Sequence, residues 1–177
     1  MKRVAIVGCG GSGKSSLAQR LGECLGIEVF YLDTLFWRPG WVRVPASEQE
    51  RTMAQILKRE KWIIDGDHPP SQPLRFSMAD TIVFLDMPQS TCLCRTLKRT
   101  LRERGRSRLG VAEGCPERLN WTLLKWILLY RRANRPSLLE NIRQHSTGRQ
   151  IVVLHSPREV DEFVDALAGL GLVIQQR

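Results

Sequence analysis

A glycine-rich loop near the start of the chain joins a short apolar run to a segment of helical spacing. The apolar run Val4–Val7 is typical of a buried parallel strand, and the loop that follows reads Gly8-Cys9-Gly10-Gly11-Ser12-Gly13-Lys14-Ser15. This order matches the pattern G-x-x-x-x-G-K-[ST], which joins a strand to a helix in phosphate-binding loops. Leu17, Leu21 and Leu25 then share one helical face, so the loop is expected to end at a helix N-terminus.

The residue types in this loop suit the binding of nucleotide phosphates. Glycines let backbone N–H groups wrap around phosphate oxygens, and the helix N-terminus adds a favourable dipole. Lys14 can neutralise the β- and γ-phosphates, and the Ser15 hydroxyl can bind Mg²⁺. ATP and Mg²⁺ are therefore the expected cofactors. The residues expected to contact the nucleotide are Gly8, Gly10, Gly11, Ser12, Gly13, Lys14, Ser15 and Ser16.

The same loop also fits a dinucleotide-binding fingerprint, G-x-G-x-x-G, at Gly8, Gly10 and Gly13. Asp33 ends the next expected strand, where dinucleotide-binding folds place an acid on a ribose hydroxyl. The Lys-Ser pair that follows Gly13 favours the phosphate-binding loop, because a dinucleotide-binding fold has no particular need for it. The chain also lacks a catalytic domain for a hydride acceptor.

Five short apolar runs alternate with segments of helical spacing along the chain. The expected strands are Val4–Val7, Glu28–Leu32, Trp62–Ile64, Thr81–Leu85 and Ile151–Leu154. Strands that alternate with helices indicate an α/β fold with a parallel sheet. We therefore predict a three-layer P-loop NTPase fold with a five-stranded parallel sheet flanked by helices. Neither a repeat nor a low-complexity linker divides the sequence, so residues 1–177 are expected to form one domain.

Three helix starts are expected from Ser-x-x-Glu capping boxes, in which each side chain bonds to the other residue's backbone N–H. The pairs are Ser47 with Glu50, Ser137 with Glu140, and Ser156 with Glu159. A proline in the first helical position strengthens the last of them. A further helix is expected over the apolar segment from Trp121 to Arg132.

Aspartates end three of the expected strands, at Asp33, Asp65 and Asp86. In open parallel sheets, ligands bind beyond the carboxyl ends of the strands, so these side chains are expected near the chemistry. Mg²⁺ prefers oxygen ligands, and Asp65 is the predicted carboxylate beside Ser15 in the metal site. Asp86 follows an equally apolar strand and remains the alternative carboxylate for the metal site. Asp33 is predicted to orient or deprotonate an acceptor hydroxyl.

The net charge of +9 arises entirely between residues 91 and 135, because basic and acidic residues balance over the rest of the chain. Leu93, Leu97 and Leu101 predict a helix in this segment, with arginines on the opposite face. Glycines interrupt the sequence beyond it, which is typical of a hinged lid, expected over about residues 102–117. The arginines expected to stabilise charge on a transferred phosphoryl group are Arg95, Arg99, Arg104 and Arg106.

The basic segment would also suit a nucleic acid, but the sequence lacks helix-turn-helix, zinc-finger and RNP signatures.

Other features of the sequence argue against a membrane protein and against a disulfide-rich secreted protein. The most apolar run, Trp121 to Tyr130, is half the length of a membrane span and contains Lys125. Five cysteines without regular spacing do not describe a disulfide framework, so the protein is expected to be cytoplasmic and not membrane-bound.

Several motifs together resemble the topology modulation protein family, which is related to adenylate kinases within the P-loop kinases. They are the loop Gly8–Ser15, Leu32-Asp33 followed by Phe36-Trp37-Arg38-Pro39-Gly40-Trp41, Trp62-Ile63-Ile64-Asp65-Gly66, Ala79-Asp80, Leu85-Asp86-Met87-Pro88, and Glu113-Gly114-Cys115-Pro116-Glu117. The resemblance implies that the glycine loop binds ATP and Mg²⁺ and that Asp65-Gly66 helps to hold Mg²⁺. It also implies that Arg95 and Arg99 match the arginines that follow the fourth strand in that family, and that Arg104–Arg108 belong to the lid.

Other features concern the acceptor. Adenylate kinases continue their Asp-Gly step with Phe-Pro-Arg, whereas this chain continues with Asp67-His68-Pro69, so AMP is not implied as the acceptor. Residues of about 33–61 are expected on the acceptor side, and the aromatic residues Phe36, Trp37 and Trp41 either stack a base or sugar or form a hydrophobic plug.

The sequence therefore predicts ATP-dependent phosphoryl transfer to a small acceptor, such as a nucleoside, a nucleotide or another hydroxylated metabolite. The alternative is a nucleic-acid-associated P-loop ATPase or regulator that acts on DNA topology. Neither the acceptor nor the oligomeric state follows from the sequence.

Overall fold

A five-stranded parallel sheet forms the centre of the computed structural model, which describes residues 1–103, 110–116 and 120–175. Its strands are ordered β2-β5-β1-β6-β7. They span Arg3–Gly8 (β1), Val29–Tyr31 (β2), Trp62–Asp65 (β5), Thr81–Leu85 (β6) and Gln150–Leu154 (β7). The predicted five-stranded parallel sheet is thus confirmed, with each strand within two residues of its expected bounds.

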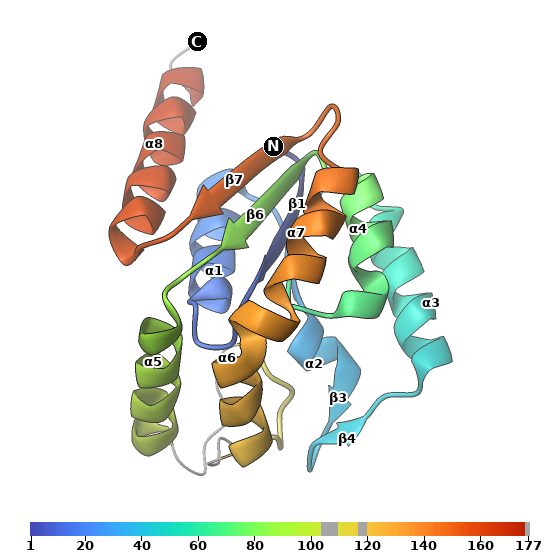
Figure 1. Ribbon diagram of the computed structural model, residues 1–177. Coiled ribbons are helices and arrows are strands. Elements are labelled where there is room, and N and C mark those ends of the chain that lie inside the picture. Colours follow the sequence, from blue (N-terminus) through green and yellow to red (C-terminus); the bar gives the residue numbers. More distant parts are fainter. Residues whose placement is uncertain (104–109, 117–119, 176–177) are drawn as a thin grey trace.

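Helices cover both faces of this sheet (Figure 1). Helix α1 packs against α8 on one face, and α4 packs against α7 on the other, so the fold has three layers. The helices are α1 (Lys14–Leu25), α2 (Leu32–Phe36), α3 (Ala46–Leu57), α4 (Gln72–Met78), α5 (Gln89–Arg102), α6 (Trp121–Ala133), α7 (Arg135–Gln144) and α8 (Pro157–Gln175), with a 3-10 turn at Pro69–Ser71.

Burial on both faces explains why the central strands read as unbroken apolar runs. All four residues from Val4 to Val7 are completely buried, as are Ile63 and Ile64 on one side and Ile82 and Val83 on the other. Strands of a parallel sheet covered on both faces have no solvent-facing side, so they show no alternation of polar and apolar residues.

The strand order places the glycine loop at a topological switch point. From β1 the chain continues to β2, two places away in the sheet, and the later strands β6 and β7 lie on the opposite side of β1. The connections that leave β1 and β6 therefore diverge at the carboxyl end of the sheet, where open α/β sheets bind their ligands.

Of the three predicted capping boxes, the one at α8 is formed in one direction only, because the Glu159 carboxylate accepts from the N–H of His155 and not from that of Ser156. At α8, Ser156 Oγ accepts from the Glu159 N–H at 3.2 Å, and Glu159 Oε2 accepts from the His155 N–H at 2.9 Å. The other two predictions are wrong. Helix α3 begins at Ala46 and α7 at Arg135, so Ser47 and Ser137 lie inside the first turn. In both cases the chain enters the helix one or two residues early, beside a proline.

The buried face of α5 also differs from the expected one. Its buried residues are Cys92, Thr96 and Thr100, whereas Leu97 is 37% exposed and Leu101 is 79% exposed. This helix packs against α6 and the glycine loop, whose backbone approaches so closely that small side chains are needed. The leucine periodicity predicted the helix correctly but assigned its buried side wrongly.

Three short elements were not predicted from the sequence: α2, α4 and a hairpin of β3 (Trp37–Arg38) and β4 (Val42–Arg43). Trp37 and Trp41 of this hairpin segment pack on a small cluster of Val111, Ala112 and Cys115. Phe36 is buried in the main core. The three aromatic side chains therefore pack on other apolar residues of the protein.

Among the helices of the described residues, none combines the length and the apolar character needed to cross a membrane.

Candidate active site

The glycine loop takes its shape from close packing against α5 and β6. Gly11 has φ +78°, and a Cβ atom there would lie 2.3 Å from the Cys92 carbonyl oxygen and 2.5 Å from Thr96 Oγ1. A Cβ atom on Gly8 would lie 2.6 Å from the Leu85 carbonyl oxygen. Only glycine fits at these two positions, because of both the space and, at Gly11, the left-handed backbone.

Two long cationic side chains secure the loop. Lys14 Nζ donates to the carbonyl oxygens of Gly8 and Cys9, at 2.8 and 2.9 Å. Arg95 Nη1 donates to the Ser12 carbonyl oxygen at 3.2 Å. These contacts tie three carbonyl groups of the loop to side chains of α1 and α5. The structure thus brings Lys14 and Arg95 together at the predicted phosphate-binding loop.

Ser15 and Asp65 form a direct contact at the start of α1. Ser15 Oγ donates to Asp65 Oδ2 at 2.7 Å, and Asp65 is 5% exposed. The register of β1 on β5 pairs Ile6 with Asp65. The carboxylate therefore lies at the carboxyl end of the strands, next to the loop. The two residues predicted to share a metal site therefore lie side by side.

Asp86, the alternative metal-side carboxylate, is bound elsewhere. Arg135 Nε and Nη2 donate to its two carboxylate oxygens at 2.9 and 2.7 Å. Burial alone would raise the pKa of Asp86, but the hydrogen bonds and the charge of Arg135 outweigh it and hold the pKa below its ordinary value. Asp86 thus joins the end of β6 to the start of α7.

The ion pair between Asp86 and Arg135 gives a prediction for stability. Arg135→Ala leaves the carboxylate of Asp86, 4% exposed, without its partner and is expected to lower the free energy of unfolding at neutral pH by about 1–3 kcal/mol. Because the folded-state pKa of Asp86 lies below 3.8, this stabilisation is present above that pH and is lost as the pH falls through the lower folded-state value.

Chemical denaturation at neutral pH and at successively lower pH values, through the range in which carboxylates titrate, measures this effect. Arg143→Ala is the matched control, because Arg143 lies on the same helix in an exposed pair with Glu140. An equal change in both variants, or one that does not shrink at low pH, would contradict the role of the Asp86 pair.

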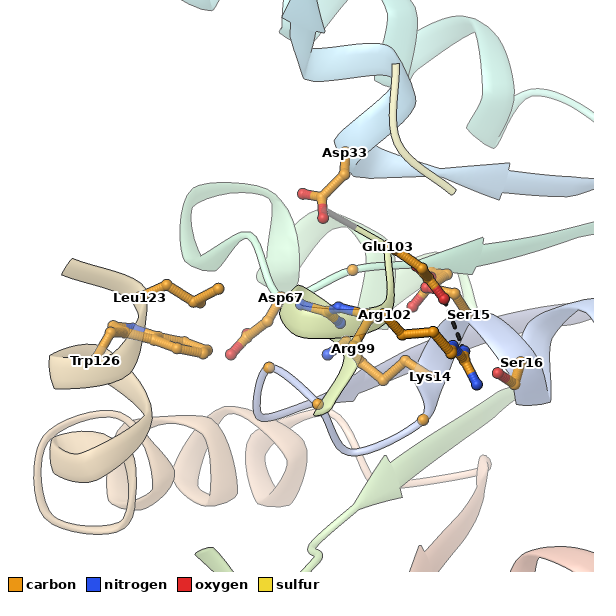
Figure 2. Close-up of a pocket in the computed structure, with 15 residues that line it drawn as sticks. Lys14, Ser15, Ser16, Asp33, Asp67, Arg99, Arg102, Glu103, Leu123 and Trp126 are labelled. Carbon is orange, nitrogen blue, oxygen red and sulfur yellow. Dashed lines mark hydrogen bonds and ion pairs between the residues drawn. The ribbon is translucent and has the colours of Figure 1, made fainter. Parts of the chain in front are cut away.

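A cavity of about 440 Å³ opens in front of the glycine loop (Figure 2). Asp33, in the first turn of α2, lies across the cavity from the loop, with its carboxylate directed toward the space between them. Trp126 of α6 closes another side and lies against Gly10. The remaining polar residues that line the cavity include Lys14, Ser15, Ser16, Asp65, Asp67, Arg99, Arg102 and Glu103.

A second hollow of about 680 Å³ lies on the other side of the loop, between α1, α5 and the start of α8. It shares Gly11, Gly13 and Arg99 with the first cavity. Its lining is basic on α1 and α5 and partly apolar at the start of α8. The basic and apolar residues concerned are Arg20, Arg95, Lys98, Arg99, Arg102, Pro157 and Val160. Asp161 of α8 also lines the hollow and forms an ion pair with Arg20.

Two charged residues of the site were missed by the sequence analysis. Asp67 lines the first cavity, and burial raises its pKa despite the opposing charges of Lys14 and Arg75. Arg75 of α4 is completely buried and donates to the Gly66 carbonyl oxygen at 3.0 Å. Burial lowers the pKa of Arg75 to about 10, and Asp67 and Asp65 oppose the shift. Asp67 stood two residues after a predicted ligand, but no local pattern indicated Arg75.

The predicted lid is described only in part. Arg104 and Arg106 lie outside the described residues, as do the other positions of 104–109 and 117–119. The part from 110 to 116 contacts the turn between β3 and β4, where the Gly40 N–H donates to the Gly114 carbonyl oxygen at 2.8 Å. The Trp41 indole N–H donates to the Pro116 carbonyl oxygen at 3.1 Å. The aromatic motif Phe36–Trp41 thus contacts the described part of the Gly-Cys-Pro motif, residues 113–116.

Comparison with models of protein families finds no match, and comparison with curated proteins finds none. Solved structures match over nearly the whole chain. A shikimate kinase from Acinetobacter baumannii in complex with shikimate is 16% identical, with a TM-score of 0.56, over 100% of this chain and 95% of that one. A gluconokinase from Sinorhizobium meliloti 1021 is 17% identical, with a TM-score of 0.53, over 99% and 98%.

A deoxyadenosine kinase from M. mycoides with bound dATP is 13% identical, with a TM-score of 0.52, over 93% of this chain and 98% of that one. At these identities the likeness shows the fold alone. The chain has the α/β fold with a five-stranded parallel sheet that is found in these P-loop small-molecule kinases.

Proposed function

We propose that this protein transfers the γ-phosphoryl group of ATP to a hydroxyl group of a small acceptor. The observation that carries the proposal is the arrangement around one cavity: a glycine loop with Lys14 on one side and the carboxylate of Asp33 on the other. A phosphoryl donor held by the loop would face an acceptor held at Asp33. Phosphoryl transfer needs mainly such positioning and charge stabilisation.

The nucleotide would extend from the loop into the hollow beside it. Arg95, Lys98 and Arg99 line that hollow and suit phosphates or ribose oxygens, while Pro157 and Val160 offer an apolar surface for the base. The basic residues of α5 that line it are therefore explained by a bound triphosphate, without a nucleic acid. This location supports the kinase over the alternative of a DNA-associated ATPase.

Ser15 and Asp65 would hold Mg²⁺ beside the phosphates. The two side chains supply the hydroxyl and carboxylate oxygens that this ion prefers, and they already lie 2.7 Å apart at the loop. When bound, Mg²⁺ would neutralise charge on the β- and γ-phosphate oxygens. Lys14 would stabilise the same charge from the loop itself.

Asp33 would orient the acceptor hydroxyl and receive its proton. In the transfer, the acceptor oxygen forms a bond to the γ-phosphorus while the bond from that phosphorus to the β–γ bridging oxygen breaks, and ADP leaves. The hydroxyl proton passes to the Asp33 carboxylate, which lies on the opposite side of the cavity from Lys14.

We also infer that the chain belongs with the topology modulation protein family. The motifs that carry the resemblance, around Trp37–Trp41 and Glu113–Pro116, lie against each other in the described part of the structure. The structurally similar kinases named above act on deoxyadenosine, shikimate and gluconate, all small hydroxylated molecules, which supports an acceptor of this general kind.

ADP release from Mg-ATP tests the proposal. It is measured with and without nucleosides, nucleotides, hydroxylated metabolites and plasmid DNA. Release that rises with one class of small molecule, together with a phosphorylated product detected by mass spectrometry, is the expected result. Release that rises only with DNA would overturn the proposal and favour the DNA-associated ATPase.

A further inference from the structure

A second cavity, of about 420 Å³, adjoins the one in front of the glycine loop. The two cavities share Asp33 and Asp67, which therefore mark the end nearest the loop. The walls between that end and the far end are mainly apolar and aromatic. They consist of Leu32, Phe36, Trp37, Pro69 and Pro70.

The far end of this cavity carries the opposite charge. Arg43 of β4 and His68 line it there. Together with Phe36 and Pro70 they also line a neighbouring apolar cavity, and none of the four lines the cavity in front of the glycine loop. In the part of the chain that the structure describes, Arg43 forms no ion pair with an acidic side chain. A cation thus lies at one end of the cavity and two carboxylates at the other.

His68 holds the guanidinium group of Arg43 in place. Arg43 Nη2 lies 3.2 Å from His68 Nε2, and His68 Nδ1 lies 3.1 Å from Ser71 Oγ. Burial, together with the charges of Arg75 and Arg43, lowers the pKa of His68 to about 4. The ring is therefore neutral at physiological pH, so Nε2 accepts from Arg43 while Nδ1–H donates to Ser71.

Phe36 restricts the ring from another side, with its centroid 4.9 Å from that of His68 in an edge-to-face arrangement. Arg43 donates to His68 through one of its nitrogen atoms. The guanidinium group has five N–H donors in a planar fork, which leaves others for a bidentate contact with a carboxylate or phosphate.

We propose that the phosphoryl acceptor is an acidic hydroxylated compound, whose carboxylate or phosphate binds Arg43 while its hydroxyl group faces Asp33. This inference rests on the proposed function for the role of Asp33. The aromatic and proline walls would contact the body of the compound. The charge at the two ends fixes its direction, because an acid turned toward Asp33 and Asp67 would meet like charges.

Ligand-observed NMR on the full chain tests this assignment with pairs of compounds that differ in an acidic group. The pairs are quinate and methyl quinate, galactonate and galactitol, and thymidine monophosphate and thymidine. For at least one pair, the acid is expected to bind more tightly than its neutral partner. Arg43→Gln is expected to weaken binding of that acid by at least about tenfold, the scale of losing a charge-assisted hydrogen bond.

Arg51→Gln is the matched control, because it removes the same charge from the exposed surface of α3 without lining the cavity. Arg43 itself is exposed on a short strand, so its replacement is not expected to unfold the protein, which thermal denaturation verifies. His68→Asn should weaken binding of the acid by less than Arg43→Gln does, and it should leave binding of the neutral partner unchanged. This is the result expected of a residue that positions Arg43.

Equal binding of acid and neutral partner, no binding of any acid, or equal binding to Arg43→Gln and Arg51→Gln would each overturn the assignment. Titration of Mg-ADP by calorimetry separates this failure from failure of the proposed function. Arg43→Gln should bind Mg-ADP like the unaltered protein. A chain that binds the acid through Arg43 but binds no Mg-ADP would retain the acid site and lose the kinase proposal.

Discussion

Lys14→Ala is expected to lower kcat for phosphoryl transfer by at least ~10²-fold, the scale of removing one key electrostatic donor from a transition state. Lys14 Nζ lies against the carbonyl oxygens of Gly8 and Cys9, so its charge is held at the middle of the loop. Transfer of the γ-phosphoryl group builds up charge on the phosphate oxygens and on the leaving ADP. Steady-state ADP release under saturating Mg-ATP measures the loss.

Two further variants test whether the ammonium group of Lys14 is what matters. Lys14→Met keeps most of the aliphatic stem and should be as inactive as Lys14→Ala, since only the ammonium group reaches the phosphates. Lys61→Ala removes an exposed lysine between α3 and β5 and should retain full activity. Turnover by Lys14→Ala within a few-fold of the unaltered protein would show that the loop is not the phosphoryl-binding element.

Asp33→Asn is expected to lower kcat by about 10²–10⁴-fold, the usual contribution of a positioned general base. Asparagine has nearly the same shape and can still accept a hydrogen bond, so acceptor binding should weaken little. The affinity for Mg-ATP should not change, because Asp33 lies across the cavity from the loop. Initial rates at varied acceptor and at varied ATP give kcat and both KM values separately.

Asp165→Asn is the matched control, since Asp165 is an exposed residue of α8. It should leave all three kinetic constants unchanged. A loss confined to the KM of the acceptor in Asp33→Asn would assign Asp33 to binding and not to proton transfer. An unchanged kcat would remove it from the chemistry altogether.

Local patterns predicted the sheet and the phosphate-binding loop because their causes are local. Apolar runs such as Val4–Val7 mark strands that are buried on both faces, whatever packs on them. Gly8, Gly11 and the Lys-Ser pair are needed by the loop itself. The helix start at Ser156 was correct for the same reason, since Ser156 Oγ accepts from the Glu159 N–H within one turn.

Predictions that depended on partners far along the chain were less successful. The leucine stripe of α5 was assigned to the buried side, but the close approach of the glycine loop requires Cys92 and Thr96 there. Arg75 gave no recognisable signal, and the signal of Arg43 was limited to its place in an aromatic and basic segment. Their positions depend on α4 and on the β3–β4 hairpin, two elements too short for periodicity to reveal.

The sequence by itself determined a parallel α/β sheet with a phosphate-binding loop after its first strand, because the hydrophobic pattern and the glycines act over a few neighbouring residues. Asp65 and Asp86, however, follow equally apolar strands, and only the tertiary structure distinguished them. Ser15, fifty positions away, contacts Asp65, while Arg135, forty-nine positions away, neutralises Asp86. Contacts at such separations depend on strand order and helix packing, which no local pattern encodes.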